Sequence, residues 1–304
     1  MRSVKTNQGF SLIELLISLS TLLIVSSSAF TLLSYYQKSY ISMEQRSDVH
    51  GGIRAAMALM TQEITQAGSL GTKPKTIHDA VTKNTSPQSV TLDPSADDIF
   101  DKEKLVIDTG TSQEIVEVQS HTSTTITGVF AQDHVATTTA MALGVFPEGI
   151  LPSSSGTQLR LVGDLNGDGK LVYGWYDCDP MTGNLTRSMK KVYAPDTDSP
   201  QLLLNHIVAN PNSVACFQYT TTTVRNFTLV TGVAITISAQ TSRKDPRTGA
   251  FVTVTESLLN ISPRNLLAGL EAARSNLMSR LQPTLQNCNN PTDPTLLPCI
   301  AWPS

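Results

Sequence analysis

One carboxylate lies inside an otherwise uncharged apolar segment near the start of the chain. Glu14 is the only charged residue between Phe10 and Gln37. A charged side chain at the centre of a membrane span costs roughly 2.5–3.5 kcal/mol on insertion scales, so it needs a partner. The segment supplies no basic residue. If the chain were cut before Phe10, the new α-amino group of a neighbouring subunit could neutralise Glu14 and set the register between packed helices.

A second group of oxygen-bearing side chains has the spacing of a cation-binding loop. Asp164, Asn166 and Asp168 alternate along the chain and Gly169 follows them. This is the pattern of the first half of an EF-hand loop, which suits calcium. Trp175 stands where that loop needs a glutamate, so the bidentate ligand is missing. The alternative is a tight turn between two strands, which needs no metal. Calcium is the one cofactor that the sequence suggests, and both interpretations stay open.

Four cysteines form an even set, which allows three pairings. We favour Cys178–Cys216 and Cys288–Cys299, because the second pair would close a short Pro-rich loop. A zinc site is disfavoured, since the cysteines include no C-x-x-C and no nearby histidine pair. Disulfides would place this part of the chain in an oxidising compartment.

The usual catalytic motifs are missing from the sequence. It contains no G-x-S-x-G, no H-E-x-x-H and no phosphate-binding glycine loop. We therefore expect a protein without enzymatic activity, and a membrane-anchored periplasmic enzyme is the alternative from another functional class. The histidines are scattered in polar or turn-like settings and are expected at the surface: His50, His78, His121, His134 and His206.

Composition limits the remaining classes. The 304 residues are enough for one or two domains, with 40% hydrophobic and only 15% charged residues. The formal net charge is −3 and basic residues form no run longer than a pair. Nucleic-acid binding requires clustered Lys and Arg, so no nucleic-acid partner is expected.

The elements around Glu14 predict a membrane topology. Residues 1–9 are polar and basic, and residues 10–36 are apolar over a length sufficient for a bilayer-spanning helix. Basic flanking residues tend to stay in the cytoplasm. We expect a single-pass inner-membrane protein whose larger part lies outside the cytoplasm.

The start of the chain also resembles a known motif. The run from Gly9 to Ile17 reads GFSLIELLI. It resembles the cleavage and methylation motif of type IV prepilins and of the pseudopilins of type II secretion. The resemblance implies that a prepilin peptidase cuts after Gly9, that Phe10 becomes the N-methylated terminus, and that Glu14 is the fifth mature residue. The motif covers about the first tenth of the chain.

Two other interpretations of the apolar segment were weighed. An ordinary secretory signal peptide would be cleaved near Ser27-Ser28-Ala29. Glu14 within the apolar region argues against it. A plain membrane anchor explains the length of the segment but not Gly9, Phe10 and Glu14 together.

Helical periodicity continues beyond the apolar segment, over residues 37–68. Gly51-Gly52 interrupts the pattern, and each Gly costs about 1 kcal/mol relative to Ala, so a bend or melted turn is expected there. Gly68 and Gly71 mark the end of the helix. One apolar stripe, with Arg54, Gln62 and Glu63 outside it, is formed by Ile53, Met57, Met60 and Ile64.

Residues 69–263 predict a β-rich head. Residues 72–103 are polar and turn-rich, and we expect them to be irregular. Asp245-Pro246 and Thr248-Gly249 predict a turn between the last two strands. Strands are predicted at 104–107, 113–119, 124–130, 157–162, 170–176, 214–220, 224–239 and 250–256.

The C-terminal region, residues 264–304, predicts an amphipathic helix over 264–282 and a Pro-rich tail fastened by Cys288–Cys299. The preceding Ser262-Pro263-Arg264-Asn265, together with the AMALMTQEITQAG stretch ending at Gly68, is similar to the PilW-like and J-type minor pilin group.

Together these features predict an α+β protein with a long N-terminal helix packed on a β-rich, pilin-like head. By resemblance it is a minor pilin that is incorporated in, or primes assembly of, a type IV pilus, with a role in cell adhesion left open. The alternative is a minor pseudopilin of type II secretion. The implied partners are other minor and major pilins, the prepilin peptidase and the inner-membrane assembly platform, and the implied location is the inner membrane and the filament.

Overall fold

The computed structural model describes residues 11–71, 73–146, 148–191, 199–224, 227–275 and 277–282. It combines one long N-terminal helix with a β-rich body, which agrees with the α+β class expected from the sequence. The chain divides into two compact units. One comprises residues 1–50 and 240–254, and the other comprises residues 51–239 and 255–304.

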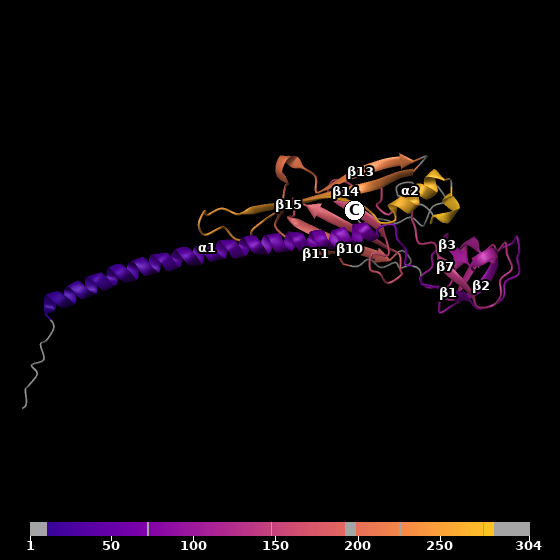
Figure 1. Cartoon of the computed structure of the whole chain (residues 1–304), viewed down its shortest axis with the longest axis horizontal. Coiled ribbons are helices and arrows are strands. Elements are labelled where there is room, and N and C mark those ends of the chain that lie inside the picture. The colour runs from indigo at the N-terminus through magenta and orange to yellow at the C-terminus, as the bar shows by residue number, and fades with distance from the viewer. Residues whose placement is uncertain are drawn as a thin grey trace, which may run out of the picture. The chain divides into compact units, whose positions relative to one another are not determined.

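Helix α1 is a single element over Leu12–Gln66 (Figure 1). The melted turn that was one expectation at Gly51-Gly52 was a wrong prediction, because both residues are helical. The structure gives a physical reason for Gly52: a Cβ there would lie 3.0 Å from Cδ1 of Leu204. The missing side chain lets a neighbouring strand approach the helix, while the rest of the helix supplies the hydrogen bonds that keep the glycine pair helical.

The helix ends where the sequence predicted it. Gly68 has a φ of +79°, the left-handed conformation that commonly follows the last turn of a helix. A second glycine is required beside it, since a Cβ on Gly149 would lie 2.3 Å from the backbone nitrogen of Gly68. Two backbones therefore meet at the C-terminal end of α1.

Residues 75–142 form a curled seven-stranded antiparallel sheet in the order β4-β3-β7-β1-β2-β6-β5. Its core includes Ile77, Leu92, Ile107 and Ile126, all at most 2% exposed. The irregular region expected at 72–103 was wrong, since it contains two central strands. The strands are β1 Lys75–Ile77, β2 Gln88–Asp93, β3 Lys104–Ile107, β4 Glu114–Glu117, β5 Ser120–His121, β6 Thr125–Gly128 and β7 Thr138–Ala142.

A second antiparallel sheet has the order β11-β10-β9-β8. Strand β9 is buried on both faces over most of its length, with Tyr173, Trp175 and Tyr176 all inside the core. A strand of this kind must lie between two packed layers. The strands are β8 Gln158–Gly163, β9 Val172–Asp179, β10 Asn184–Lys191 and β11 Gln201–Leu204.

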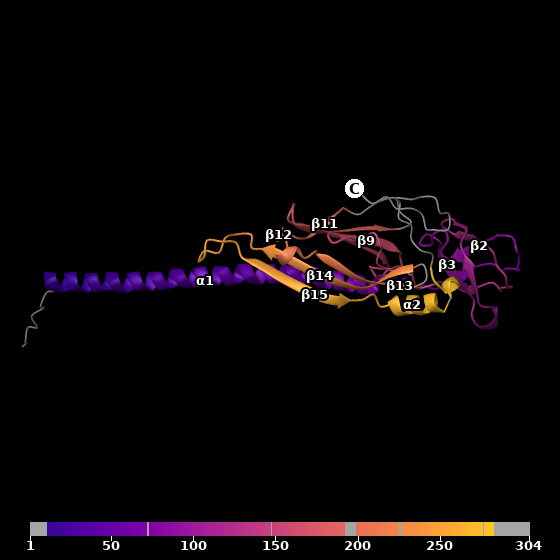
Figure 2. The same ribbon diagram turned by 90° about the horizontal axis from the view of Figure 1, so that it is seen from above.

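The third sheet is built around the long strand β14, which pairs with β12, β13 and β15 (Figure 2). The turn predicted between the last two strands is confirmed: the N–H of Gly249 donates to the carbonyl of Asp245 at 2.7 Å. The strands are β12 Ile207–Val208, β13 Phe217–Val224, β14 Phe227–Gln240 and β15 Thr253–Ile261.

The C-terminal helix is shorter than the predicted span of 264–282. Helix α2 covers Leu266–Arg274, and one 3-10 turn follows at Met278–Arg280. The segment is nevertheless fixed to the body by Gln282, whose amide donates to the carbonyls of Lys104 and Leu143 at 3.0 and 2.8 Å. Two further 3-10 turns lie at Gly110–Ser112 and Pro211–Ser213.

Candidate functional site

The N-terminal part of α1 exposes large apolar side chains on every face. Leu12 is 78% exposed and Ile24 is 69% exposed, and the aromatic rings of Phe30 and Tyr40 are equally accessible. None of the most apolar stretch is buried inside the structure, and the helix is long and apolar enough to cross a membrane. A helix that is apolar all round needs a non-aqueous environment, so this surface requires lipid or other protein.

The hydroxyl groups in this segment do not oppose such an environment. Ser18 donates to the carbonyl of Glu14 at 2.8 Å, Thr21 to that of Ile17 at 3.0 Å, and Thr31 to that of Ser27 at 2.9 Å. Each hydroxyl proton is thus satisfied within the helix itself. The segment can enter an apolar medium without leaving these donors unpaired.

Glu14 is the exception in the segment. Its side chain is exposed, and no described residue pairs with its carboxylate. Gly9 and Phe10, the residues predicted for processing, lie outside the described part of the chain. Cleavage, methylation and the pairing of Glu14 with a neighbouring amino group therefore stay predictions.

The C-terminal half of α1 is buried on one side, as its periodicity predicted. Ile53, Met57, Met60 and Ile64 are all at most 3% exposed. Four such side chains on one face fix this part of the helix by burial of apolar surface, at about 1.5–3 kcal/mol for each fully buried side chain.

Glu63 was wrongly placed by the sequence reasoning, which set it outside the buried stripe. It is 1% exposed, and the hydroxyl of Tyr176 donates to its Oε2 at 2.5 Å. Nε of Arg187 donates to Oε1 at 2.8 Å, and a second guanidinium N–H contacts the same oxygen. Tyr176 lies on β9 and Arg187 on β10, so one carboxylate of the helix holds two adjacent strands.

The pKa shifts of Tyr176 and Arg187 keep both side chains protonated beside the Glu63 carboxylate. Burial and the neighbouring Glu63 carboxylate raise the pKa of Tyr176, which therefore stays protonated and donates. Burial alone would lower the pKa of Arg187, but the hydrogen bond and charge of Glu63 give a net rise. Removing one partner of a buried ion pair of this kind strongly destabilises the folded state.

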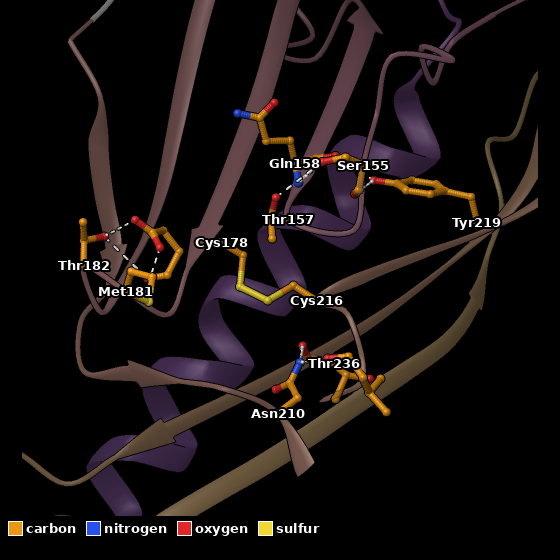
Figure 3. The surroundings of a disulfide bond; sticks show 12 residues. Ser155, Thr157, Gln158, Cys178, Met181, Thr182, Asn210, Cys216, Tyr219 and Thr236 are labelled. Atoms are coloured by element: carbon orange, nitrogen blue, oxygen red, sulfur yellow. Dashed lines mark hydrogen bonds between the residues drawn. A yellow bond between two sulfur atoms is a disulfide. The ribbon is translucent and has the colours of Figure 1, made fainter. Parts of the chain in front are cut away.

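The Cys178–Cys216 disulfide predicted from the sequence is present, and its cysteines are 38 positions apart in the sequence (Figure 3). Cys178 belongs to β9, and Cys216 directly precedes β13, so the bond joins the second and third sheets. Beside it, the hydroxyl of Tyr219 donates to the carbonyls of Ser155 and Gln158 at 3.0 and 2.8 Å. Residues 288 and 299, the second predicted pair Cys288–Cys299, lie outside the described residues.

Residues 164–171 form the loop that joins β8 to β9. Oδ1 and Oδ2 of Asp164 accept the N–H groups of Asp168 and Gly169, both at 2.9 Å. Oδ1 of Asp168 accepts the N–H of Lys170 at 2.9 Å. These bonds account for the conformation without a cation. In the described part of the chain, no three His, Cys, Asp or Glu residues are grouped to hold a metal, and a calcium site at Asp164, Asn166 and Asp168 stays a prediction.

His134 was expected at the surface, and that expectation was wrong. Its side chain is fully buried, with Nε2 at 2.6 Å from Oε1 of Glu114 and Nδ1 at 3.3 Å from Oδ2 of Asp108. A backbone hydrogen bond from Thr109, followed by the contact with His134, lowers the pKa of Asp108. The group fastens the loop between β6 and β7 to β4, which a single sequence does not reveal, because the partners are distant along the chain.

No family model, no curated protein and no solved structure matches this chain.

Proposed function

We propose that this chain is a minor pilin of the PilW-like kind, which is inserted in the inner membrane, cleaved between Gly9 and Phe10, and built through α1 into a type IV pilus. The observation that carries the proposal is the position of Glu14, five residues after Gly9, as the only charged residue in the exposed apolar segment between Phe10 and Gln37. The proposed role is structural, either priming assembly or occupying a place near the filament tip.

The apolar half of α1 is suited to two environments in succession. Before assembly, lipid would cover the exposed side chains of residues 12–40. After assembly, the same surface would pack on the helices of neighbouring pilins. Apolar packing has little directionality, so it does not by itself specify how far one subunit is displaced along the next.

Glu14 would supply that missing specificity. Its carboxylate has no partner among the described residues, and the amino group of a neighbour's processed Phe10 has the opposite charge. In an apolar filament core, this pair would be favoured over any register that leaves both charges unpaired.

The head would be carried by the second half of the helix. The buried stripe and the Glu63 group hold that half to strands β9 and β10.

The first experiment is intact mass and N-terminal peptide mapping of the protein isolated from its native membrane. A chain that begins with N-methylated Phe10 would support the proposal. A chain that begins at Met1, or close to Phe30, would refute it and favour an anchored or secreted protein.

The second experiment tests the role of Glu14. Glu14→Ala is expected to be cleaved normally but to be incorporated poorly into filaments. The matched control is Glu44→Ala, which removes an exposed carboxylate from the same helix outside the apolar segment. Normal incorporation of Glu14→Ala would remove the pairing argument.

A minor pseudopilin of type II secretion would share the same processing and the same helix. The partners separate the two: co-purification with pilus subunits and the pilus assembly platform supports the first, and co-purification with a secretion pseudopilus supports the second. Turnover by uncleaved protein would instead indicate the anchored enzyme.

A further inference from the structure

A lysine, an aspartate and a buried glutamate meet beside the first strand of the seven-stranded sheet, in a part of the head that the proposed function does not use. Lys75 opens β1, Asp98 lies in the loop between β2 and β3, and Glu103 directly precedes β3 (Figure 1). All three line one small cavity, which has room for a water molecule.

The amine and the carboxyl group are held in close approach. Nζ of Lys75 lies 2.6 Å from Oδ1 of Asp98, and the two side chains are only 11% and 18% exposed. Nζ also donates to the carbonyl of Ser95 at 2.6 Å, which directs the amine toward this loop. Although Nζ is so near, Oδ1 of Asp98 accepts no hydrogen bond from the described residues. The contact is a close approach of the two groups without hydrogen-bond geometry.

Glu103 has the properties of a proton carrier beside this pair. Its side chain is 2% exposed, and its Oε2 accepts the N–H of Phe100 at 3.1 Å. Burial, opposed by that hydrogen bond, raises the pKa of Glu103 to about 8, with Asp98 contributing to the rise and Lys75 opposing it. Glu103 is therefore a protonated acid at neutral pH, electrostatically coupled to both partners.

We propose that Lys75 and Asp98 condense into an intramolecular amide bond between Nζ and Cγ, with Glu103 as the proton carrier. The surroundings favour the reaction, since two charges in a poorly hydrated site are costly and can become neutral by transfer of one proton from the ammonium to the carboxylate. Holding the reacting groups together replaces a bimolecular encounter by an intramolecular one.

The atoms balance without an oxidant or a second reactant. After the proton transfer, neutral Nζ attacks Cγ of the Asp98 acid while Glu103 donates its proton to the carbonyl oxygen. Nζ then gives one proton back to Glu103. One hydroxyl of the tetrahedral carbon leaves as water with the proton of the other hydroxyl, whose oxygen becomes the amide carbonyl. The Nζ–Cγ bond forms, one Cγ–O bond breaks, and Glu103 ends protonated as it began. The net loss is one water molecule.

The product would close residues 75–98 into a ring that contains β1 and β2, which already pair along Thr76 and Ile77. Unlike a disulfide, this bond would persist under reducing conditions. The proposal does not depend on whether the chain is a pilin, and the two can fail separately.

The test is peptide mapping of the full-length, folded protein after reduction and trypsin digestion. Trypsin does not cleave after an acylated lysine, so residues 55–83 are expected to be joined to residues 84–102, one water lighter than the two linear peptides together. Recovery of Lys75 and Asp98 only in unmodified linear peptides would overturn the proposal, and this measurement needs no variant that might fail to fold.

Matched variants assign the roles. Lys75→Arg keeps the positive charge and Asp98→Ala removes the carboxyl group, and either is expected to abolish the branched peptide. Lys73→Arg and Asp97→Ala, which alter the neighbouring lysine and the adjacent exposed aspartate, are expected to retain it. A branched peptide that survives Asp98→Ala would overturn the assignment of the bond.

Glu103→Gln keeps both reacting groups and a side chain of similar shape but cannot carry a proton. At equal times after synthesis, digestion of this variant is expected to yield at least tenfold more of the linear peptides than digestion of the wild type. Branched peptide at the wild-type level in this variant would overturn the role given to Glu103.

Discussion

Helix α1 carries two glutamates in apolar surroundings, and they differ in burial and in hydrogen-bond partners. Glu63 is buried, and Tyr176 and Arg187 from two strands of the same chain saturate its carboxylate. Glu14 lies among exposed leucines and isoleucines, and no described residue pairs with it. The helix is the same element in both regions, so the difference arises from what surrounds it.

The difference between Glu63 and Glu14 distinguishes a carboxylate that stabilises its own fold from one that could pair with another molecule. A carboxylate that is satisfied inside its own chain fixes a fold, because removing either partner leaves a buried group uncompensated. Glu14 has no partner among the described residues, and under the proposed function its carboxylate would select a second molecule.

The largest effect is expected at Glu63. Glu63→Ala leaves the guanidinium of Arg187 and the hydroxyl of Tyr176 without their buried acceptor, and should lower the free energy of unfolding of the head by about 3–5 kcal/mol. The measurement is urea denaturation of the full chain in detergent, followed by tryptophan fluorescence, since Trp175 lies in β9 beside Tyr176.

Glu14→Ala is the matched control for Glu63→Ala on the same helix. Because Glu14 is exposed and its carboxylate pairs with no described residue, its removal should change the unfolding free energy of the head by less than about 0.5 kcal/mol. Equal destabilisation by the two substitutions would contradict the contrast drawn here.

The disulfide should come second in size. Removing it as Cys178→Ala with Cys216→Ala opens a 38-residue separation, which should lower stability by about 2–4 kcal/mol through the greater freedom of the unfolded chain. The same denaturation experiment checks it, with dithiothreitol added to the wild type as a second route to the open form. A double variant as stable as the oxidised wild type would show that packing alone holds the two sheets.

The sequence was informative wherever one local pattern decides the structure. The stripe of Ile53, Met57, Met60 and Ile64, the glycine that ends α1 and the strand at 104–107 all follow from periodicity or turn chemistry. The Cys178–Cys216 bond was one of three possible pairings, and only the position of β9 beside the segment before β13 explains why it forms.

The sequence failed where distant residues supply the stabilisation. Strands β1 and β2 contain mostly Thr, Ser, Gln and Lys, and they are strands because β6 and β7 pair with them. Glu63 is buried because Arg187, 124 residues away, neutralises it. Gly51 and Gly52 remain helical although their propensity is poor, because tertiary packing overrides propensity.

A third carboxylate, Glu103, lies between the two cases, since it is buried but has only one backbone donor and a nearby lysine. Burial raises its pKa from 4.5 to about 8. Between these values the folded state keeps a proton that the unfolded state releases, so stability should fall as pH rises, by up to about 1.4 kcal/mol per pH unit.

The measurement is the pH dependence of urea unfolding from about pH 5 to pH 8, compared between the wild type and Glu103→Gln. Burial also raises the pKa of Glu148 to about 7, but that group contributes to both proteins and cancels in the difference between their slopes. Equal slopes would indicate that Glu103 ionises in the folded state as readily as in the unfolded one.

The smallest change in stability is expected at Gly51 and Gly52. These two substitutions also test which face of α1 lies against β11. Nothing lies within 4 Å of a Cβ added at Gly51, so Gly51→Ala should stabilise the helix by up to about 1 kcal/mol. At Gly52 the added methyl group would lie 3.0 Å from Leu204, which must move, so Gly52→Ala should gain less or lose stability. Equal gains in urea denaturation would mean that β11 does not approach the helix as closely as described. A gain at Gly51 alone would locate the boundary between the free and the packed face of α1 to a single residue step.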